Sequence, residues 1–316
     1  MATSAGRESA PAPTAFESPA WAAARPALSI LIPSFRDDPQ RLLGALDRPD
    51  LPVEIVLIDD GSGDPQLVSR LACAVLRLAA PARFLALPAN EGRARVRNRL
   101  ARAARASNLL FLDADMLPDR PDFLDRWLAL VSTQGPPAAF GGFSLDQAPL
   151  DPAHAVHRRM ALRGDCAPPE VRRRAPEKHV FTSNLLVRRD VFEAAPFDNG
   201  FRGWGWEDVE WAARVVRTHP ILHVDIPATH LGLDTACAMA TKFEQSAANF
   251  GRLAAAHPDL VQTYPLYKAA RFLKAFPLRR LWRPWLKAAA VSDIPPATLR
   301  ALALRLYRAA LYAETI

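Results

Sequence analysis

Apolar runs and helix-like segments alternate along the first third of the chain. The apolar runs are residues 28–32, 53–58, 83–87 and 108–112, and the helix-like segments between them are 39–46, 65–80 and 92–106. A strand that is buried on both faces has a continuous apolar sequence, and strands that alternate with helices form a parallel sheet. The pattern therefore predicts an α/β fold: a mainly parallel, Rossmann-like nucleotide-binding sheet with helices on both faces.

Polar residues follow each of the four apolar runs. The clusters are Ser34–Asp37, Asp59–Ser62, Asn90–Gly92 and Asp113–Asp115. Ligands of open α/β sheets bind outside the carboxyl ends of the strands, so four clusters in register predict one binding site there. A single cluster would be weak support, because Asp and Asn also begin helices and turns.

The last of these clusters has the form Asp-x-Asp. Alternate residues of a strand point the same way, so Asp113 and Asp115 can face one site. Carboxylate oxygens suit Mg²⁺ or Mn²⁺ bridging a diphosphate. The alternative is a capping role for Asp113 and a solvated Asp115; the three preceding clusters favour the metal site.

A second group of chemically active residues lies at 197–210, where two tryptophans alternate with glycines before adjacent acids. A carboxylate beside an apolar wall has a raised pKa, which suits Asp208 or Glu207 to act as a general base. In the alternative interpretation the two acids stabilise a helix N-terminus and the tryptophans are core residues.

Taken together, the motifs between about Leu28 and Gly232 resemble a family 2 glycosyltransferase of the GT-A fold. The later part is similar to chondroitin-polymerase-like and β-galactosyltransferase-like catalytic domains. The motifs are Pro33-Ser34-Phe35, Asp59-Asp60-Gly61-Ser62, Asn90-x-Gly92, Arg97-Asn98, Asp113-Ala114-Asp115, Thr182 to Arg189 and Gly203 to Glu210.

The resemblance implies roles around the donor and the metal. The residues it places at the nucleotide are Pro33, Phe35, Asp59, Asp60, Arg93 and Asp113. Asp115 would bind Mn²⁺ or Mg²⁺, which neutralises the leaving diphosphate. His230 is either a second metal ligand or a structural histidine.

The resemblance also implies roles on the acceptor side. Asp208 would be the general base, with Glu207 holding sugar hydroxyls. Trp204 would form a stacking wall for a sugar ring, Trp206 would narrow the acceptor pocket, and Asn184 would contact substrate. Arg36 departs from the family pattern, in which a polar Asn commonly follows the aromatic residue.

The implied reaction is an inverting transfer from a nucleoside-diphosphate sugar, a UDP-sugar in particular, to a hydroxyl of a saccharide or lipid-linked acceptor, as in surface polysaccharide biosynthesis. One alternative is a sugar nucleotidyltransferase, but the sequence lacks a glycine- and lysine-rich triphosphate loop after the first apolar run. The other is a non-catalytic nucleotide-sugar-binding adaptor at a membrane, which would be expected to have lost Asp115 or Asp208, and both are present.

Composition divides the chain into three parts. Residues 1–26 are rich in Ala, Pro and Ser and predict a disordered leader. Residues 27–263 form the glycosyltransferase domain, with the donor half at 27–120 and the acceptor half at 121–263. Residues 264–316 form a basic, amphipathic, helical C-terminal extension.

The extension is the most basic part of a chain with 40 Lys and Arg against 33 Asp and Glu. Residues 268–287 contain no acid, and Pro277 and Pro284 would break them into short pieces. They predict either a hairpin on an anionic membrane or a face that packs on the catalytic domain. No nucleic-acid motif is present. Scattered cysteines and the lack of a long apolar run predict a cytoplasmic protein, peripheral on the inner membrane.

Overall fold

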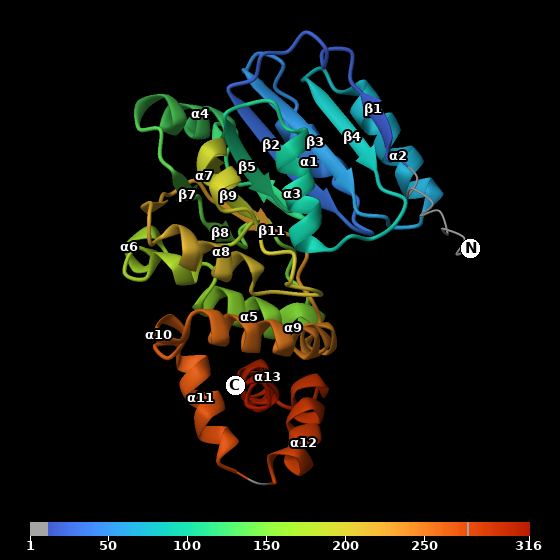
Figure 1. The fold of residues 1–316 in the computed structure, drawn as a ribbon. Helices are drawn as coiled ribbons and strands as arrows, with labels where there is room; N and C mark the ends of the chain where they lie inside the picture. Colours follow the sequence, from blue (N-terminus) through green and yellow to red (C-terminus); the bar gives the residue numbers. More distant parts are fainter. Residues whose placement is uncertain (1–11, 277) are drawn as a thin grey trace, which may run out of the picture.

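A computed structural model describes residues 12–276 and 278–316 (Figure 1). Its centre is a mixed sheet in the order β1-β4-β3-β2-β5-β9-β7-β10. The strands are β1 (Thr14–Glu17), β2 (Leu28–Ser34), β3 (Val53–Asp59), β4 (Ala82–Ala86), β5 (Asn108–Leu112), β7 (Ala138–Phe140), β9 (Asn184–Arg188) and β10 (Ile221–His223). Strands β4, β3, β2 and β5 are parallel, as the apolar runs predicted, whereas β9 is antiparallel to both of its neighbours.

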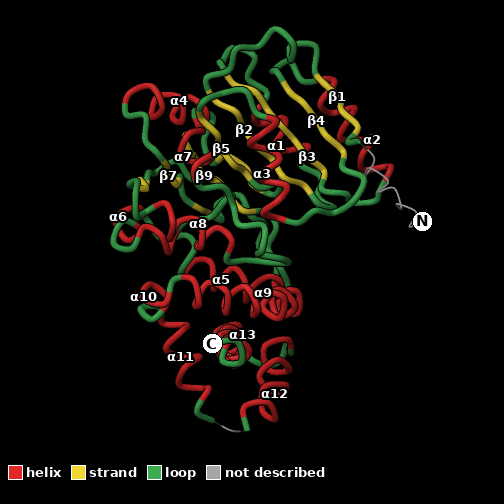
Figure 2. The backbone as a smooth tube through the Cα atoms, viewed as in Figure 1, coloured by secondary structure: helices red, strands yellow, loops and turns green. Residues whose placement is uncertain are grey.

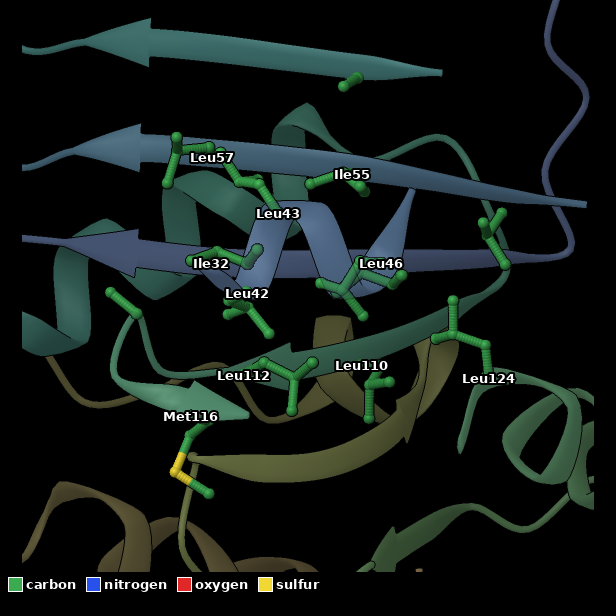
Figure 3. Packing of buried hydrophobic residues seen from close by; sticks show 14 of the residues in the cluster. Ile32, Leu42, Leu43, Leu46, Ile55, Leu57, Leu110, Leu112, Met116 and Leu124 are labelled. Carbon is green, nitrogen blue, oxygen red and sulfur yellow. The ribbon is translucent and has the colours of Figure 1, made fainter. Parts of the chain in front are cut away.

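Helices cover both faces of the sheet, which confirms the predicted α/β class. One face packs against α1 (Gln40–Leu46), α2 (Pro65–Arg77) and α4 (Phe123–Thr133). The other packs against α3 (Arg93–Ala103), α7 (Arg189–Ala194) and α8 (Glu207–Val215). Figure 3 shows the first face, where Leu42, Leu43 and Leu46 of α1 lie against Ile32 and Leu57 of the strands.

A small second sheet lies at the carboxyl edge of the large one. It joins β6 (Met116–Pro118), β11 (Ala228–His230) and β8 (Phe143–Ser144). Strand β11 is antiparallel to β6, with His230 opposite Met116. This pairing brings residues more than a hundred positions apart next to the turn that carries Asp113 and Asp115.

The remaining elements are helices: η1 (Pro152–His154), α5 (Ala155–Arg163), α6 (Pro169–Arg172), η2 (Pro176–His179), α9 (Ala236–Ala256), α10 (Pro258–Val261), α11 (Pro265–Lys274), α12 (Arg279–Val291) and α13 (Ala297–Tyr312). Of these, α5 and α9 to α13 lie together below the strands (Figure 2). The predicted helical extension is thus present, with α13 between α11 and α12 (Figure 1) and packed against α9 and α5. Within the described residues, no helix is both long and apolar enough to cross a bilayer.

The prediction of a disordered leader over residues 1–26 is wrong for its second half, while residues 1–11 lie outside the described residues. Strand β1 pairs with β4 and protects the edge of the sheet, and the ring of Phe16 stacks on that of Phe84 at 5.8 Å. Trp21 is 6% exposed, with the Arg105 guanidinium 3.7 Å from its ring centre.

One further feature differs from the prediction. Pro284 does not break the extension but lies inside α12, where a proline has no amide hydrogen to donate. Pro277 lies outside the described residues. Strand β10 ends at His223, and residues 224–227 leave the large sheet to reach β11.

Candidate active site

The site begins where two loops meet beyond the carboxyl ends of β3 and β4. One oxygen of the Asp60 carboxylate accepts a hydrogen bond from the Glu91 amide at 2.8 Å. The other accepts from the Gly92 amide at 2.9 Å and from the Asn90 side chain at 3.0 Å. The carboxylate is also buried. Through these hydrogen bonds Asp60 connects the cluster at 59–62 to the cluster at 90–92.

Asp59 shapes the turn that precedes this contact. Its carboxylate accepts from the Ser62 amide at 3.1 Å and from the Ser62 hydroxyl, which in turn accepts from the Arg36 amide at 2.6 Å. Gly61 has a φ of 66°, and a side chain there would come within 2.2 Å of the Ala89 backbone. Only glycine fits this turn.

The first polar cluster forms the open rim of the site. Phe35 is 39% exposed, Pro33 is half-buried, and the Arg36 guanidinium lies 4.9 Å from the centre of the Phe35 ring. An exposed aromatic ring with a stacked guanidinium offers a flat surface of the kind on which a base can stack.

An Arg and carboxylate network joins the two acidic motifs. Arg97 Nη2 lies 2.6 Å from Asp113 Oδ1, and Arg97 Nη1 lies 3.6 Å from Glu207 Oε1. Arg93, one turn earlier on α3, lies 2.7 Å from Glu207 Oε1 and 3.8 Å from Asp113 Oδ2. The two arginines thereby hold Asp113 and Glu207, which are more than ninety positions apart in the sequence, in one cluster.

The network gives the two adjacent acids of α8 opposite properties. Burial opposes ionisation of Glu207, but Arg93 and Arg97 outweigh it and hold its pKa below the ordinary value. Burial raises the pKa of Asp208, and the neighbouring Glu207 charge raises it further, to about 7. Glu207 is thus ionised at neutral pH, whereas the raised pKa of Asp208 would suit it to exchange a proton near neutrality.

Asp115 lies in the turn between β5 and β6 and pairs with His230 on β11. Asp115 Oδ2 is 3.0 Å from His230 Nε2. A side chain at Gly232 would come within 2.1 Å of the same carboxylate oxygen, so the close approach of this segment requires glycine. The other ring nitrogen of His230, Nδ1, is buried without a hydrogen-bond partner.

This pair can supply part of a metal site. Among the described residues, no group of three or more His, Cys, Asp or Glu side chains forms a complete metal cage. One carboxylate and one imidazole fit a site in which the other ligands come from a diphosphate and water, and imidazole suits Mn²⁺ better than Mg²⁺.

Comparisons with known proteins decide the family. The model of Glycosyl transferase family 2 matches residues 29–195, which is more than half of the chain. The chain belongs to this family. The match ends before Glu207, Asp208 and His230, so the second half of the site lies beyond it. The sequence matches none of the curated proteins with which it was compared.

Solved structures agree with the family. The mannosyltransferase PcManGT from Pyrobaculum calidifontis, in complex with GDP-Man and Mn²⁺, has a TM-score of 0.56 at 16% identity, over 90% of this chain and 86% of that one. S. aureus TarS 1–349 gives 0.51 at 15% identity, over 91% and 89%. Glucosyl-3-phosphoglycerate synthase from Mycobacterium tuberculosis, with Mn²⁺, UDP and glucosyl-3-phosphoglycerate, gives 0.52 at 14% identity, over 73% and 79%. The protein is a glycosyltransferase of the GT-A fold.

The two tryptophans of this glycosyltransferase differ in their surroundings. Trp204 is half-buried near Phe243 and has the Lys242 amine 5.9 Å from its ring centre, so part of its surface stays open. Trp206 instead turns towards the C-terminal extension, where its Nε1 donates to the Tyr312 hydroxyl at 3.2 Å. Trp206 therefore contacts α13, a contact that its sequence position did not reveal.

The prediction that Asn184 contacts substrate needs correction. Its side chain is 0% exposed, at the start of β9, and its amide donates to the carbonyls of Gly142 and Ile226 at 2.9 and 2.8 Å. Because no surface of Asn184 is open, it holds together the strands behind the site.

Arg97 and Asn98 are the functional residues to which sequence reasoning gave no role. Asn98 donates to the Phe197 carbonyl at 2.9 Å and accepts from the Phe197 amide at 3.0 Å, which ties α3 to the loop before α8. The four-residue spacing of Arg93 and Arg97 was the available signal, because it places both guanidiniums on one face of a helix.

Proposed function

We propose that this glycosyltransferase is metal-dependent and inverting, and that it moves a sugar from a uridine-diphosphate sugar to a hydroxyl of a saccharide or lipid-linked acceptor, in the synthesis of a surface polysaccharide. The observation that carries the proposal is the network of Arg93 and Arg97, because it joins the donor-side Asp113 to the segment that holds Asp208.

The donor would lie across the carboxyl edge of the sheet. Phe35 and Pro33 offer apolar surface for the base, while Asp59 and Asp60 hold the loops that frame the ribose. Arg93 is half-buried at the N-terminus of α3, where its charge would balance a phosphate. Asp113 would approach the ribose.

Asp115 and His230 would hold the divalent metal, Mn²⁺ or Mg²⁺. When bound, such a metal stabilises the negative charge that develops on the leaving diphosphate. Gly232 leaves room for the Asp115 carboxylate to lie beside His230, since a side chain at position 232 would displace that carboxylate.

Asp208 would take the proton from the acceptor hydroxyl as the new bond to the anomeric carbon forms. The bond to the nucleoside diphosphate breaks on the opposite face, so one displacement inverts the configuration and the proton ends on Asp208. Glu207 stays charged and would orient sugar hydroxyls, and the open face of Trp204 would stack on the acceptor ring.

Calorimetric binding of UDP and GDP, each with Mn²⁺ and with a chelator, tests the donor half. We expect UDP to bind only with the metal, and Asp115→Asn to abolish that binding. Asp122→Asn, an exposed acid paired with Arg120, is the matched control and should bind as the wild type does. Tight binding of UDP in chelator would contradict the metal role, and absence of binding to either nucleotide would contradict the donor half of the proposal.

The acceptor side is supported by an exposed apolar surface on the extension. Nine of the fourteen exposed large hydrophobic side chains of the described chain lie on it: Phe272, Phe276, Leu278, Leu281, Trp285, Ile294, Leu299, Leu302 and Leu306. Exposed basic residues, Lys268 and Arg271 on α11, lie beside them. Apolar side chains flanked by cations suit the interface of an anionic membrane, where a lipid-linked acceptor would reside.

Substitutions at the α11–α12 hairpin test this part without removing α13. Leu281 and Trp285 are 68% and 76% exposed, so changing both to Ser should leave the fold intact. We expect the double variant to lose co-sedimentation with vesicles of phosphatidylglycerol and phosphatidylcholine. Leu150→Ser, at a residue 82% exposed outside the extension, is the control. Equal co-sedimentation of all three proteins would reject the membrane surface.

A further inference from the structure

Trp206 has a backbone conformation that a tryptophan rarely adopts. Its φ is 78° and its ψ is −10°, in the left-handed region, and only one other non-glycine residue of the described chain, Arg36, has a positive φ. This conformation is unfavourable for a residue with a Cβ atom, so the surrounding structure must impose it. Glu207 and Asp208 follow directly, as the first two residues of α8.

Helix α9 holds the loop before Trp206 by a separate set of hydrogen bonds. The Asn249 side chain donates to the carbonyls of Arg202 and Gly205 at 2.9 and 3.0 Å and accepts from the Arg202 amide at 3.3 Å. These contacts stop at Gly205. On the other side of Trp206, Arg93 and Arg97 hold Glu207. The left-handed residue between the two has an anchor of its own, through its side chain.

That anchor is the last turn of α13. The Tyr312 hydroxyl accepts from Trp206 Nε1 at 3.2 Å and from Arg308 Nε at 3.1 Å, and it lies in hydrogen-bond contact with the Ser246 hydroxyl. The Trp206 ring packs on Phe250 at 5.0 Å, and the Arg308 guanidinium lies 5.0 Å from its centre.

The Tyr312 hydroxyl has no hydrogen-bonding capacity left over. A phenol accepts two hydrogen bonds and donates one. The Tyr312 oxygen accepts from Trp206 and Arg308, so the Tyr312 hydroxyl proton is left to be donated to Ser246. Tyr312 is 0% exposed, so a group removed from this cluster could not be replaced by bulk water.

We propose that Tyr312 is a positioning residue of the active site: its hydroxyl holds Trp206 in the left-handed conformation, and this sets the direction of the first turn of α8 and hence of Asp208. The inference rests on the proposed role of Asp208 as the base. It assigns to the extension, which lies outside the family match, a part in catalysis.

The chain offers a matched control on the same helix. Tyr307 is also buried on α13, and its hydroxyl donates to Glu244 Oε1 at 2.5 Å and makes no hydrogen bond to residues 203–208 of the described chain. Tyr307→Phe and Tyr312→Phe each remove one buried hydroxyl from one helix. A purely structural effect would appear in both variants.

The first measurement is hydrogen–deuterium exchange of the full chain over residues 203–210. We expect Tyr312→Phe to speed exchange there, and Tyr307→Phe to leave it unchanged. The second is turnover of the nucleotide sugar that the wild type hydrolyses or transfers: Tyr312→Phe should lower kcat roughly 10–100-fold with KM for the donor unchanged. Equal exchange and equal kcat in the two variants would overturn the proposal.

A double substitution tests whether Tyr312 acts through Trp206. If it does, adding Tyr312→Phe to Trp206→Phe should change kcat little, whereas independent effects would multiply. Should Tyr312→Phe fail to fold, Trp206→Phe removes the same hydrogen bond from the other side and must speed exchange over 203–210. Exchange is measured without substrate, so it decides the positioning role even if the protein turns over no nucleotide sugar.

Discussion

Arg97 lies between Asp113 and Glu207, with its Nη2 2.6 Å from the first and its Nη1 3.6 Å from the second. Its side chain is buried, and so is that of Glu207. A buried guanidinium between two carboxylates is favourable only while all of them are present, because each charge compensates the desolvation of the others. Stability and the geometry of the candidate site therefore depend on the same residue.

Replacing Arg97 with Met should destabilise the fold by about 3 kcal/mol, because the buried Glu207 and the half-buried Asp113 then have only Arg93 to compensate their charges. Urea unfolding followed by circular dichroism measures the loss. Arg99→Met on the same helix is the control, since Arg99 pairs with Glu91 at the surface and should contribute less than about 1 kcal/mol. Equal stability of the two variants would contradict the burial argument.

Asp208 should govern the pH dependence of turnover. A general base must be ionised, and its pKa is raised to about 7, so kcat/KM should rise with pH up to about 7 and level off above it. Glu207→Gln removes the neighbouring charge that raises this pKa and should move the midpoint to lower pH. An unchanged midpoint in this variant would show that the ionisation of Asp208 does not control kcat/KM.

Asp208→Asn should gain stability while it loses roughly 10²–10⁴-fold in turnover. The folded-state pKa of Asp208 lies above its ordinary value of 3.8, so the folded protein holds a proton that the unfolded chain releases between about pH 4 and 7. Stability of the wild type therefore falls as pH rises through this window. The variant should have the higher Tm at pH 8, with the gap closing near pH 4; a gap independent of pH would refute this account.

Gly232→Ala should weaken metal-dependent UDP binding at least tenfold, because the added methyl group would lie 2.1 Å from Asp115 Oδ2 and displace it. Calorimetry with Mn²⁺ measures the change. Gly164→Ala is the control, since the nearest atom there would be 3.7 Å away. Wild-type affinity in Gly232→Ala would show that the position of Asp115 does not matter for the nucleotide.

Trp21→Ala should cost about 3 kcal/mol of stability, because the ring is buried beneath Arg105 beside strand β1. Thermal unfolding checks this value. A change below about 0.5 kcal/mol, as at an ordinary surface position, would mean that the packing of Trp21 contributes little to the fold.

The sequence was sufficient to predict the strands whose own apolar residues indicate that they are buried. Strands β2, β3 and β5 are mostly apolar, and the polar clusters after them lie together as expected. Strand β1 was missed because Thr14–Glu17 has no apolar pattern of its own, and its pairing with β4 depends on the rest of the sheet.

The candidate site was predictable in its residue types and not in its contacts. The two acidic motifs were visible, but the link through Arg97 depends on how α3 packs against both. The anchoring of Trp206 by Tyr312 joins positions 106 apart and leaves no local signal. The aspartates of the Asp-x-Asp motif lie in the turn after β5, so strand alternation was not what brought them to the edge.

The contact between Trp206 and α13 also sets an order of events during synthesis. A ribosome makes the chain from its N-terminus, so the nucleotide-binding half emerges and can fold well before Tyr312 is added. Until then, the residue before Glu207 lacks the partner that holds it in a left-handed conformation. If Tyr312 positions Asp208 as proposed, a nascent chain could complete its nucleotide-side loops first, and catalytic competence would follow only once α13 has been made and packed.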